Sequence, residues 1–272
     1  MLYAAGFGIL AGAMLTFPAQ AADAAWLGLT LWARSVAPVL GPFMVCMLML
    51  TSRVGGGMSF RTVLCWLCGS PGGARLMQEA RLSGPAALRA AAMTGTMSPM
   101  FFLGTVEGWL GKGGSGWLLL GCHIAGAFCL GLCFRAERRK EQSTAVPMPL
   151  SAALRESALA LLTVALCMML GCVSSRMAAC AFPGLPPGGT AAMQCALEVT
   201  AGVKALTQLN PPFALPLVCA ACSFGGLSLL MQNAAFWQES SVGLPQLLLL
   251  RLAHGLLSGS LCLIAQQLLG YG

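Results

Sequence analysis

Long apolar runs, separated by short polar or glycine- and proline-containing turns, make up most of this chain. Several runs carry no charge and reach the length of about 20 residues that a helix needs to cross the hydrocarbon of a membrane. The pattern predicts an all-α, polytopic membrane protein with about seven spans. The predicted spans are 1–22, 38–50, 86–106, 117–134, 152–175, a run from 211 to the polar turn at 232–243, and 245–269.

Residues 23–34 follow the first span and place two tryptophans, Trp26 and Trp32, at helical spacing with Leu27 and Leu31. This spacing predicts a short amphipathic helix at the membrane interface, with its tryptophans at the level of the lipid headgroups. The first run lacks the Lys or Arg that precedes the apolar core of a signal peptide, which favours a spanning helix.

Two further apolar segments are too short or too polar to cross the membrane as a single helix. Residues 62–81 are interrupted by Gly, Ser and Pro at 69–73, and residues 191–209 are interrupted around 198–202. Each pattern predicts a re-entrant hairpin, which enters the membrane and leaves by the same side.

The two sides of a basic linker have the same plan: a span, a broken hairpin, a kinked span and a closing span. Four parts follow: an N-terminal span with its interfacial helix (1–34), a first repeat (35–134), a cytoplasmic linker (135–150) and a second repeat (151–272). Because each repeat holds an odd number of crossings, the second is predicted to be inverted relative to the first.

Loop charge agrees with this topology. With the linker in the cytoplasm, outside loops carry only Arg34, Lys112, Arg176 and Lys204. The other cations weighed fall at or near the inside, as the positive-inside rule expects: Arg53, Arg61, Arg75, Arg81, Arg89, Arg135, Arg138, Arg139, Lys140, Arg155 and Arg251.

The interruptions predict a binding site. A helix broken in lipid leaves N–H and C=O groups unpaired, each costing several kcal/mol unless something replaces the bond. Breaks at corresponding positions of inverted repeats therefore point to the solute site of a secondary transporter. The predicted solute-binding residues are Ser70, Gly72, Gly73, Arg75, Ser98, Glu198, Thr200, Lys204, Ser223, Gly225 and Gly226.

Arg75 and Lys204 stand at matching positions of the two hairpins, and an ionisable group at membrane depth suggests function. Both could bind an anionic solute; the alternative is that they snorkel to water or pair with Glu79 and Glu198. The small hydroxyl residues could bind solute or serve contacts between helices.

Composition narrows the function. Only 8% of residues are charged, against roughly 25% in soluble domains. The net charge of +7 is not gathered into a basic patch with interleaved aromatics, which argues against nucleic acid. No catalytic constellation is visible, so we expect no enzyme.

The 13 cysteines lie mostly inside apolar runs, where Cys behaves as a small hydrophobe. No zinc-ligand pattern accompanies them, and neither metal nor cofactor is expected. His123 and His254 stand singly in apolar spans; a hydrogen-bonded interior histidine is favoured over a proton relay at both positions.

Four motifs in one order carry a family resemblance: 69–75, 98–105, 197–202 and 223–228. With them the chain resembles the sporulation integral membrane proteins of the YlbJ (SpoVV) type, from about Ala25 onward. The resemblance implies two Gate (nucleoside-recognition) domains and a transporter that moves dipicolinate into the developing spore, in the outer forespore membrane. Concentrative nucleoside transporters share the Gate domain.

The leading hypothesis is thus a carrier or facilitator for a small anionic metabolite, dipicolinate first, with or without a cation. Two cationic hairpin tips suit a small aromatic dianion. A Gate-domain carrier of nucleosides or another solute, and a non-transporting scaffold of a sporulation complex, are the alternatives. The lipid bilayer is the expected environment, and the low charge is compatible with a homodimer without demanding one.

Overall fold

The computed structural model describes the chain except for residues 1, 53–57, 71–81, 136–146, 237–241 and 271–272. Within this part of the chain the regular elements are helices, and no strand occurs. In chain order they are α1 (Leu2–Thr16), α2 (Pro18–Leu31), the π-helix η1 (Trp32–Val36), α3 (Ala37–Thr51), α4 (Met58–Cys68), α6 (Gly84–Thr94), the π-helix η2 (Phe101–Val106), α7 (Glu107–Leu110), α8 (Ser115–Leu132), α9 (Leu150–Ala181), α10 (Pro187–Leu197), α11 (Val199–Leu209), α12 (Ala214–Phe224), α13 (Gly226–Phe236) and α14 (Leu244–Leu269).

Five helical stretches among the described residues are long and apolar enough to cross a membrane. The predicted class, an all-α polytopic membrane protein, is therefore confirmed, while the total number of crossings stays a prediction. The five are Pro18–Leu50, Ser115–Leu132, Leu150–Ala181, Ala214–Ala235 and Leu244–Leu269.

The N-terminal part differs from the predicted span at 1–22 and separate interfacial helix at 23–34. The first helix ends at Thr16, and residues 18–50 form one continuous helical stretch. The sequence predicts that Pro38 and Pro42 open a new span, but both lie within helix α3. The π-helix η1 (Trp32–Val36) lies just before Pro38, and the Ala37 N–H donates to the Trp32 carbonyl oxygen, so the chain stays helical up to the proline, which has no N–H to donate.

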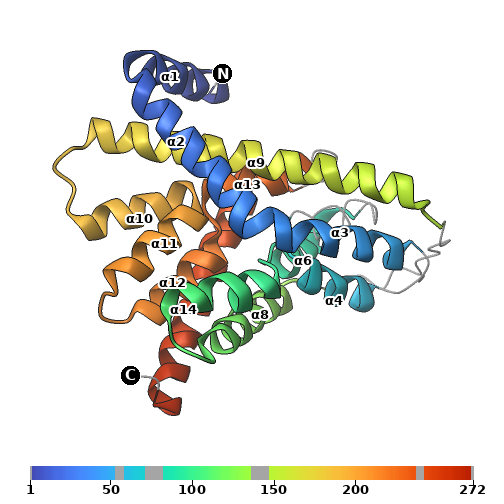
Figure 1. Ribbon diagram of the computed structural model, residues 1–272. Helices are drawn as coiled ribbons and strands as arrows, with labels where there is room; N and C mark the ends of the chain where they lie inside the picture. The colour runs from blue at the N-terminus through green and yellow to red at the C-terminus, as the bar shows by residue number, and fades with distance from the viewer. Residues whose placement is uncertain (1, 53–57, 71–81, 136–146, 237–241, 271–272) are drawn as a thin grey trace.

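Small residues allow the spanning helices to approach closely. Figure 1 shows α9 along one edge with α2 crossing it, and α10 and α11 lying side by side beneath it. Helix α14 packs against α8 and α12. A Cβ placed on Gly255 would lie 3.0 Å from the carbonyl oxygen of Ala220, and one on Gly259 would lie 2.9 Å from the Ala220 Cβ. The small-xxx-small spacing of α14 thus sets this contact.

Three breaks fall where the sequence predicted interruptions. Helix α6 ends at Thr94 and regular helix resumes at Pro99; α12 ends at Phe224; and α10 passes to α11 through the extended residue Glu198. The hairpin predicted at 62–81 is described as far as Ser70, and its remainder lies outside the described residues.

The hairpin of α10 and α11 depends on one close contact. A Cβ on Gly202 would overlap the backbone nitrogen of Cys195 on the paired helix. We expect Gly202→Ala to lower the free energy of unfolding by about 1–3 kcal/mol, as overpacking does, in a thermal-unfolding assay of purified protein in detergent. Gly188→Ala on α10 is the control, because no atom lies within 4 Å of a Cβ there. Equal melting temperatures for the two variants would contradict this packing.

Candidate functional site

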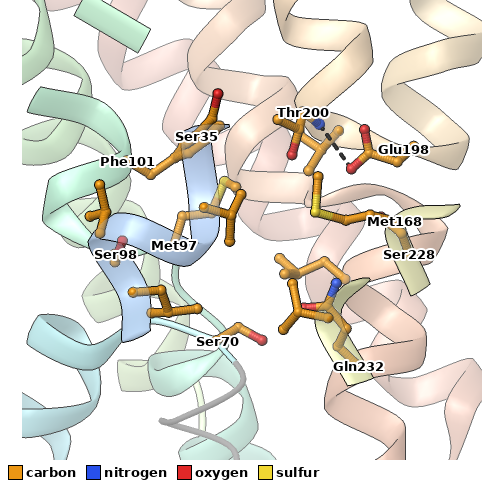
Figure 2. Close-up of a pocket in the computed structure, with 16 residues that line it drawn as sticks. Ser35, Ser70, Met97, Ser98, Phe101, Met168, Glu198, Thr200, Ser228 and Gln232 are labelled. Atoms are coloured by element: carbon orange, nitrogen blue, oxygen red, sulfur yellow. Dashed lines mark hydrogen bonds between the residues drawn. The ribbon is translucent and has the colours of Figure 1, made fainter. Parts of the chain in front are cut away.

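A cavity lies where the breaks of the two halves come together (Figure 2). Its empty volume, which includes its opening, is about 560 Å³. The wall consists of Ser35, Val36, Val39, Leu40, Ser70, Met97, Ser98, Phe101, Val164, Met168, Glu198, Val199, Thr200, Ser228, Leu229 and Gln232.

The breaks bring polar groups to opposite sides of this cavity. Figure 2 shows Ser35 and Ser98 on one side, and Glu198, Thr200 and Ser228 facing them. The polar groups are hydroxyls, one amide and one carboxylate, and the rest of the wall is aliphatic, methionine or phenylalanine. Such a wall suits a small molecule with an apolar body and a few hydrogen-bonding groups.

In each half, the end of a hairpin helix lies against the broken helix of the same half. After α4, the Ser70 N–H donates to the carbonyl oxygen of Thr96, in the break that follows α6, at 2.7 Å. In the second half, a Cβ on Gly226 would lie 3.2 Å from the Val199 nitrogen at the start of α11. At the cavity the two halves are joined by the Ser70 hydroxyl, which donates to Asn233 Oδ1 of α13 at 2.5 Å.

Glu198 is a fully buried carboxylate, 0% exposed, in the wall of the cavity. Its two oxygens accept from the backbone N–H groups of Thr200 at 3.2 Å and Ala201 at 2.6 Å, so it caps the N-terminus of α11. Burial raises the pKa of this carboxyl group, and the same N–H donors oppose the shift. Within the described residues, no ion pair with Lys204 or another cation is formed.

Arg251 binds the free backbone carbonyl groups at the break that follows α6, as Glu198 binds the free N–H groups at the start of α11. It is 2% exposed, and one guanidinium nitrogen donates to the carbonyl oxygens of Ala91 at 2.8 Å and Ala92 at 3.1 Å. Its other terminal nitrogen donates to the Gly95 carbonyl oxygen. Arg251 lies within α14, where free carbonyls at the end of α6 bind it, and its predicted position at or near the inside stays a prediction.

Two histidines complete this polar interior, and their partners determine their tautomers. His123 Nε2 accepts from the Met97 N–H at 3.0 Å, so Nδ1 carries the proton and donates to the Ser223 hydroxyl at 2.7 Å. His254 Nε2 donates to the His123 carbonyl oxygen at 2.9 Å, which leaves Nδ1 to accept from Arg251 at 3.2 Å. Hydrogen-bonded interior histidines, the favoured prediction, are confirmed.

The structure brings four of the predicted site residues into the cavity wall: Ser70, Ser98, Glu198 and Thr200. The remaining described residues lie elsewhere. Ser223 binds His123 in the interior, Gly225 ends α12 with a positive φ of 83°, and Gly226 packs against the α10–α11 turn.

Lys204 is half-buried on α11 and does not line the cavity. Gly72, Gly73 and Arg75 lie outside the described residues. Whether these residues contact solute therefore stays a prediction. The ranges that the structure describes hold no group of three His, Cys, Asp or Glu side chains able to bind a metal.

The sequence reasoning did not single out Ser35, Ser228, Gln232 or Arg251. Ser228 and Gln232 lie four residues apart, on one face of α13, so both reach the cavity. The sequence does mark Arg251: it is a lone cation inside an otherwise apolar run, and an ionisable residue at membrane depth indicates a functional or structural role.

The chain is similar to the sporulation integral membrane protein YlbJ of Bacillus subtilis (strain 168), with 29% identity over 166 residues. The matched region covers 52% of this chain and 41% of the relative, so the chain spans less than half of that protein's length. The match supports the resemblance to this family of membrane proteins.

No protein-family model matches the chain. No solved structure matches it either.

The buried guanidinium yields a stability prediction. Arg251→Met removes the donors to three carbonyl groups and should destabilise the protein by roughly 3 kcal/mol or more. Arg155→Met, at an exposed position of α9, is the matched control and should change little. Thermal unfolding in detergent compares them, and an Arg251→Met protein as stable as the control would show that the capping role is wrong.

Proposed function

We propose that this protein is a carrier or facilitator for a small organic anion, with dipicolinate as the first solute to test. The observation that supports the proposal most is the cavity, because it lies where breaks from both halves of an all-helical membrane protein meet. Breaks of this kind are typical of solute sites in secondary transporters.

The wall supplies the groups that recognition of such a solute needs. Hydroxyl and amide donors on several elements can hydrogen-bond carboxylate oxygens, and the aliphatic and methionine side chains can contact an aromatic ring. Arg75 and Lys204 are the proposed source of positive charge near the hairpin tips. The anionic class and dipicolinate itself come from these two cations and from the family resemblance.

Because few polar bonds cross the cavity, solute exchange between the two membrane sides is proposed to occur by movement of α11 and α13 relative to the first half, with the contact of α14 and α6 retained. The inverted relation of the halves, the two re-entrant hairpins and location in the outer forespore membrane belong to the same proposal.

A neutral polar solute, such as a nucleoside, is the second candidate. The described wall favours it, because apart from one carboxylate its polar groups are uncharged. The two candidates differ in what they demand of Arg75 and Lys204: an anion needs at least one of these cations, whereas a nucleoside needs neither.

Uptake by reconstituted vesicles tests the proposal. We expect labelled dipicolinate to enter proteoliposomes faster than empty vesicles. Gln232→Leu should slow entry by roughly tenfold to a hundredfold, as loss of one hydrogen bond to a charged group predicts. Gln208→Leu, exposed on α11, is the control.

The outcomes separate the candidates. Dipicolinate entry that is lost in Arg75→Ala or Lys204→Ala supports the anion carrier. Uridine entry with no effect of either substitution supports the nucleoside carrier. If neither solute moves faster than in empty vesicles, the carrier proposal fails and a scaffold role is left.

A further inference from the structure

Glu198 presents a problem for any anionic solute. Its carboxylate is fully buried in the wall of the cavity, and no cation among the described residues pairs with it. A solute carboxylate beside this buried carboxylate would be repelled, because like charges a few ångströms apart are weakly screened inside a protein. Because Lys204 does not line the cavity, an anion beside Glu198 is favoured when a positive charge enters with it.

The surroundings of Glu198 contain no built-in counter-charge. Helix α9 places Gly171 and Cys172 beside it, α10 contributes Cys195, and α13 contributes Ser228. These groups are thiols, a hydroxyl and backbone. The N-terminus of α11 stabilises the carboxylate through two N–H groups, and this partial charge does not cancel a second anion.

One further group lies beside the carboxylate where a proton could be held. The Ser228 hydroxyl, 1% exposed, makes no hydrogen bond of ordinary geometry, yet it lies close enough to Glu198 to stabilise the charged carboxylate, which lowers the pKa of that group. A hydroxyl can donate to a carboxylate, and by rotating its O–H it can accept from a protonated carboxyl group.

We propose that Glu198 is the coupling site of the carrier, and that it takes up one proton from solvent when an organic anion enters the cavity. The O–H bond forms on a carboxylate oxygen, and Ser228 Oγ accepts its hydrogen bond. When the anion leaves on the other side, the proton returns to solvent there. This inference rests on the proposed function, since it requires an anionic solute.

A proton fits this position better than a metal ion. Both carboxylate oxygens already face N–H donors, whose partial positive charge opposes a metal cation. A protonated carboxyl group is neutral and keeps an acceptor oxygen for those donors. Burial, which raises the pKa of Glu198, acts in the same direction.

Calorimetry of dipicolinate binding to the purified full chain tests the proton directly. Titrations at neutral pH in buffers of different ionisation enthalpy report the protons taken up per solute bound. We expect about one proton for wild type and about none for Glu198→Gln, which remains neutral. Glu156→Gln, outside the cavity wall, is the control and should behave as wild type. No proton uptake by wild type, or equal uptake by Glu198→Gln, overturns the inference.

Proteoliposomes give a second reading that does not depend on calorimetry. An inward proton gradient should accelerate wild-type dipicolinate uptake about tenfold and leave Glu198→Gln unaffected. Ser228→Ala removes a hydroxyl that stabilises the charged carboxylate, so the variant should reach half-maximal uptake in a less acidic solution than wild type.

The two proposals fail in different ways. If wild type neither binds nor moves dipicolinate, the anion carrier is overturned and this inference with it. If wild type moves dipicolinate at a rate independent of the proton gradient, or a sodium gradient drives it at constant pH, only the proton site is overturned.

Discussion

Backbone N–H and C=O groups that are freed where a helix breaks must find partners, and the interior of a membrane protein supplies no bulk water for them. At the break after α6, four residues provide these partners. Arg251 binds its carbonyls, His123 accepts from Met97, Ser70 donates to Thr96, and the Trp66 ring N–H donates to the Met93 carbonyl at 2.6 Å. These partners come from α14, α8 and α4, so satisfying one break fixes how several helices pack.

The two buried charges follow the polarity of the helix ends that hold them. The end of α6 presents carbonyl oxygens and receives a guanidinium, whereas the start of α11 presents N–H groups and receives a carboxylate. Neither charge has an ionic partner among the described residues, and each is compensated by backbone dipoles. Arg251 and Glu198 therefore form no ion pair with each other. The carboxylate lies in the cavity wall, whereas the guanidinium is enclosed by backbone carbonyls.

The sequence predicted the breaks more accurately than the elements around them. Gly, Pro and Ser mark a break directly, so the interruptions near Ser98, Glu198 and Gly225 fell where they were expected. The predicted start of a new span at Pro38 was wrong. Proline is tolerated inside a continuous apolar helix, and here the π-helix η1 precedes it. Ser228 and Gln232 lie on a regular helix, and which face of that helix meets the cavity depends on tertiary packing that one sequence does not reveal.

Fewer hydrogen bonds join the two halves at the cavity than at the Arg251 and histidine network. Behind it, the Arg251 and histidine network ties α6, α8, α12 and α14 together. At the cavity, Glu198 is held by N–H groups of its own helix, and Ser70 bonds Asn233 across the halves. Displacing α11 and α13 relative to Ser70 breaks few of these interactions, whereas displacing α14 relative to α6 leaves several buried carbonyls without donors. The change of shape that the proposed transport requires is therefore least costly on the cavity side, with the Arg251 network remaining intact as the fixed part.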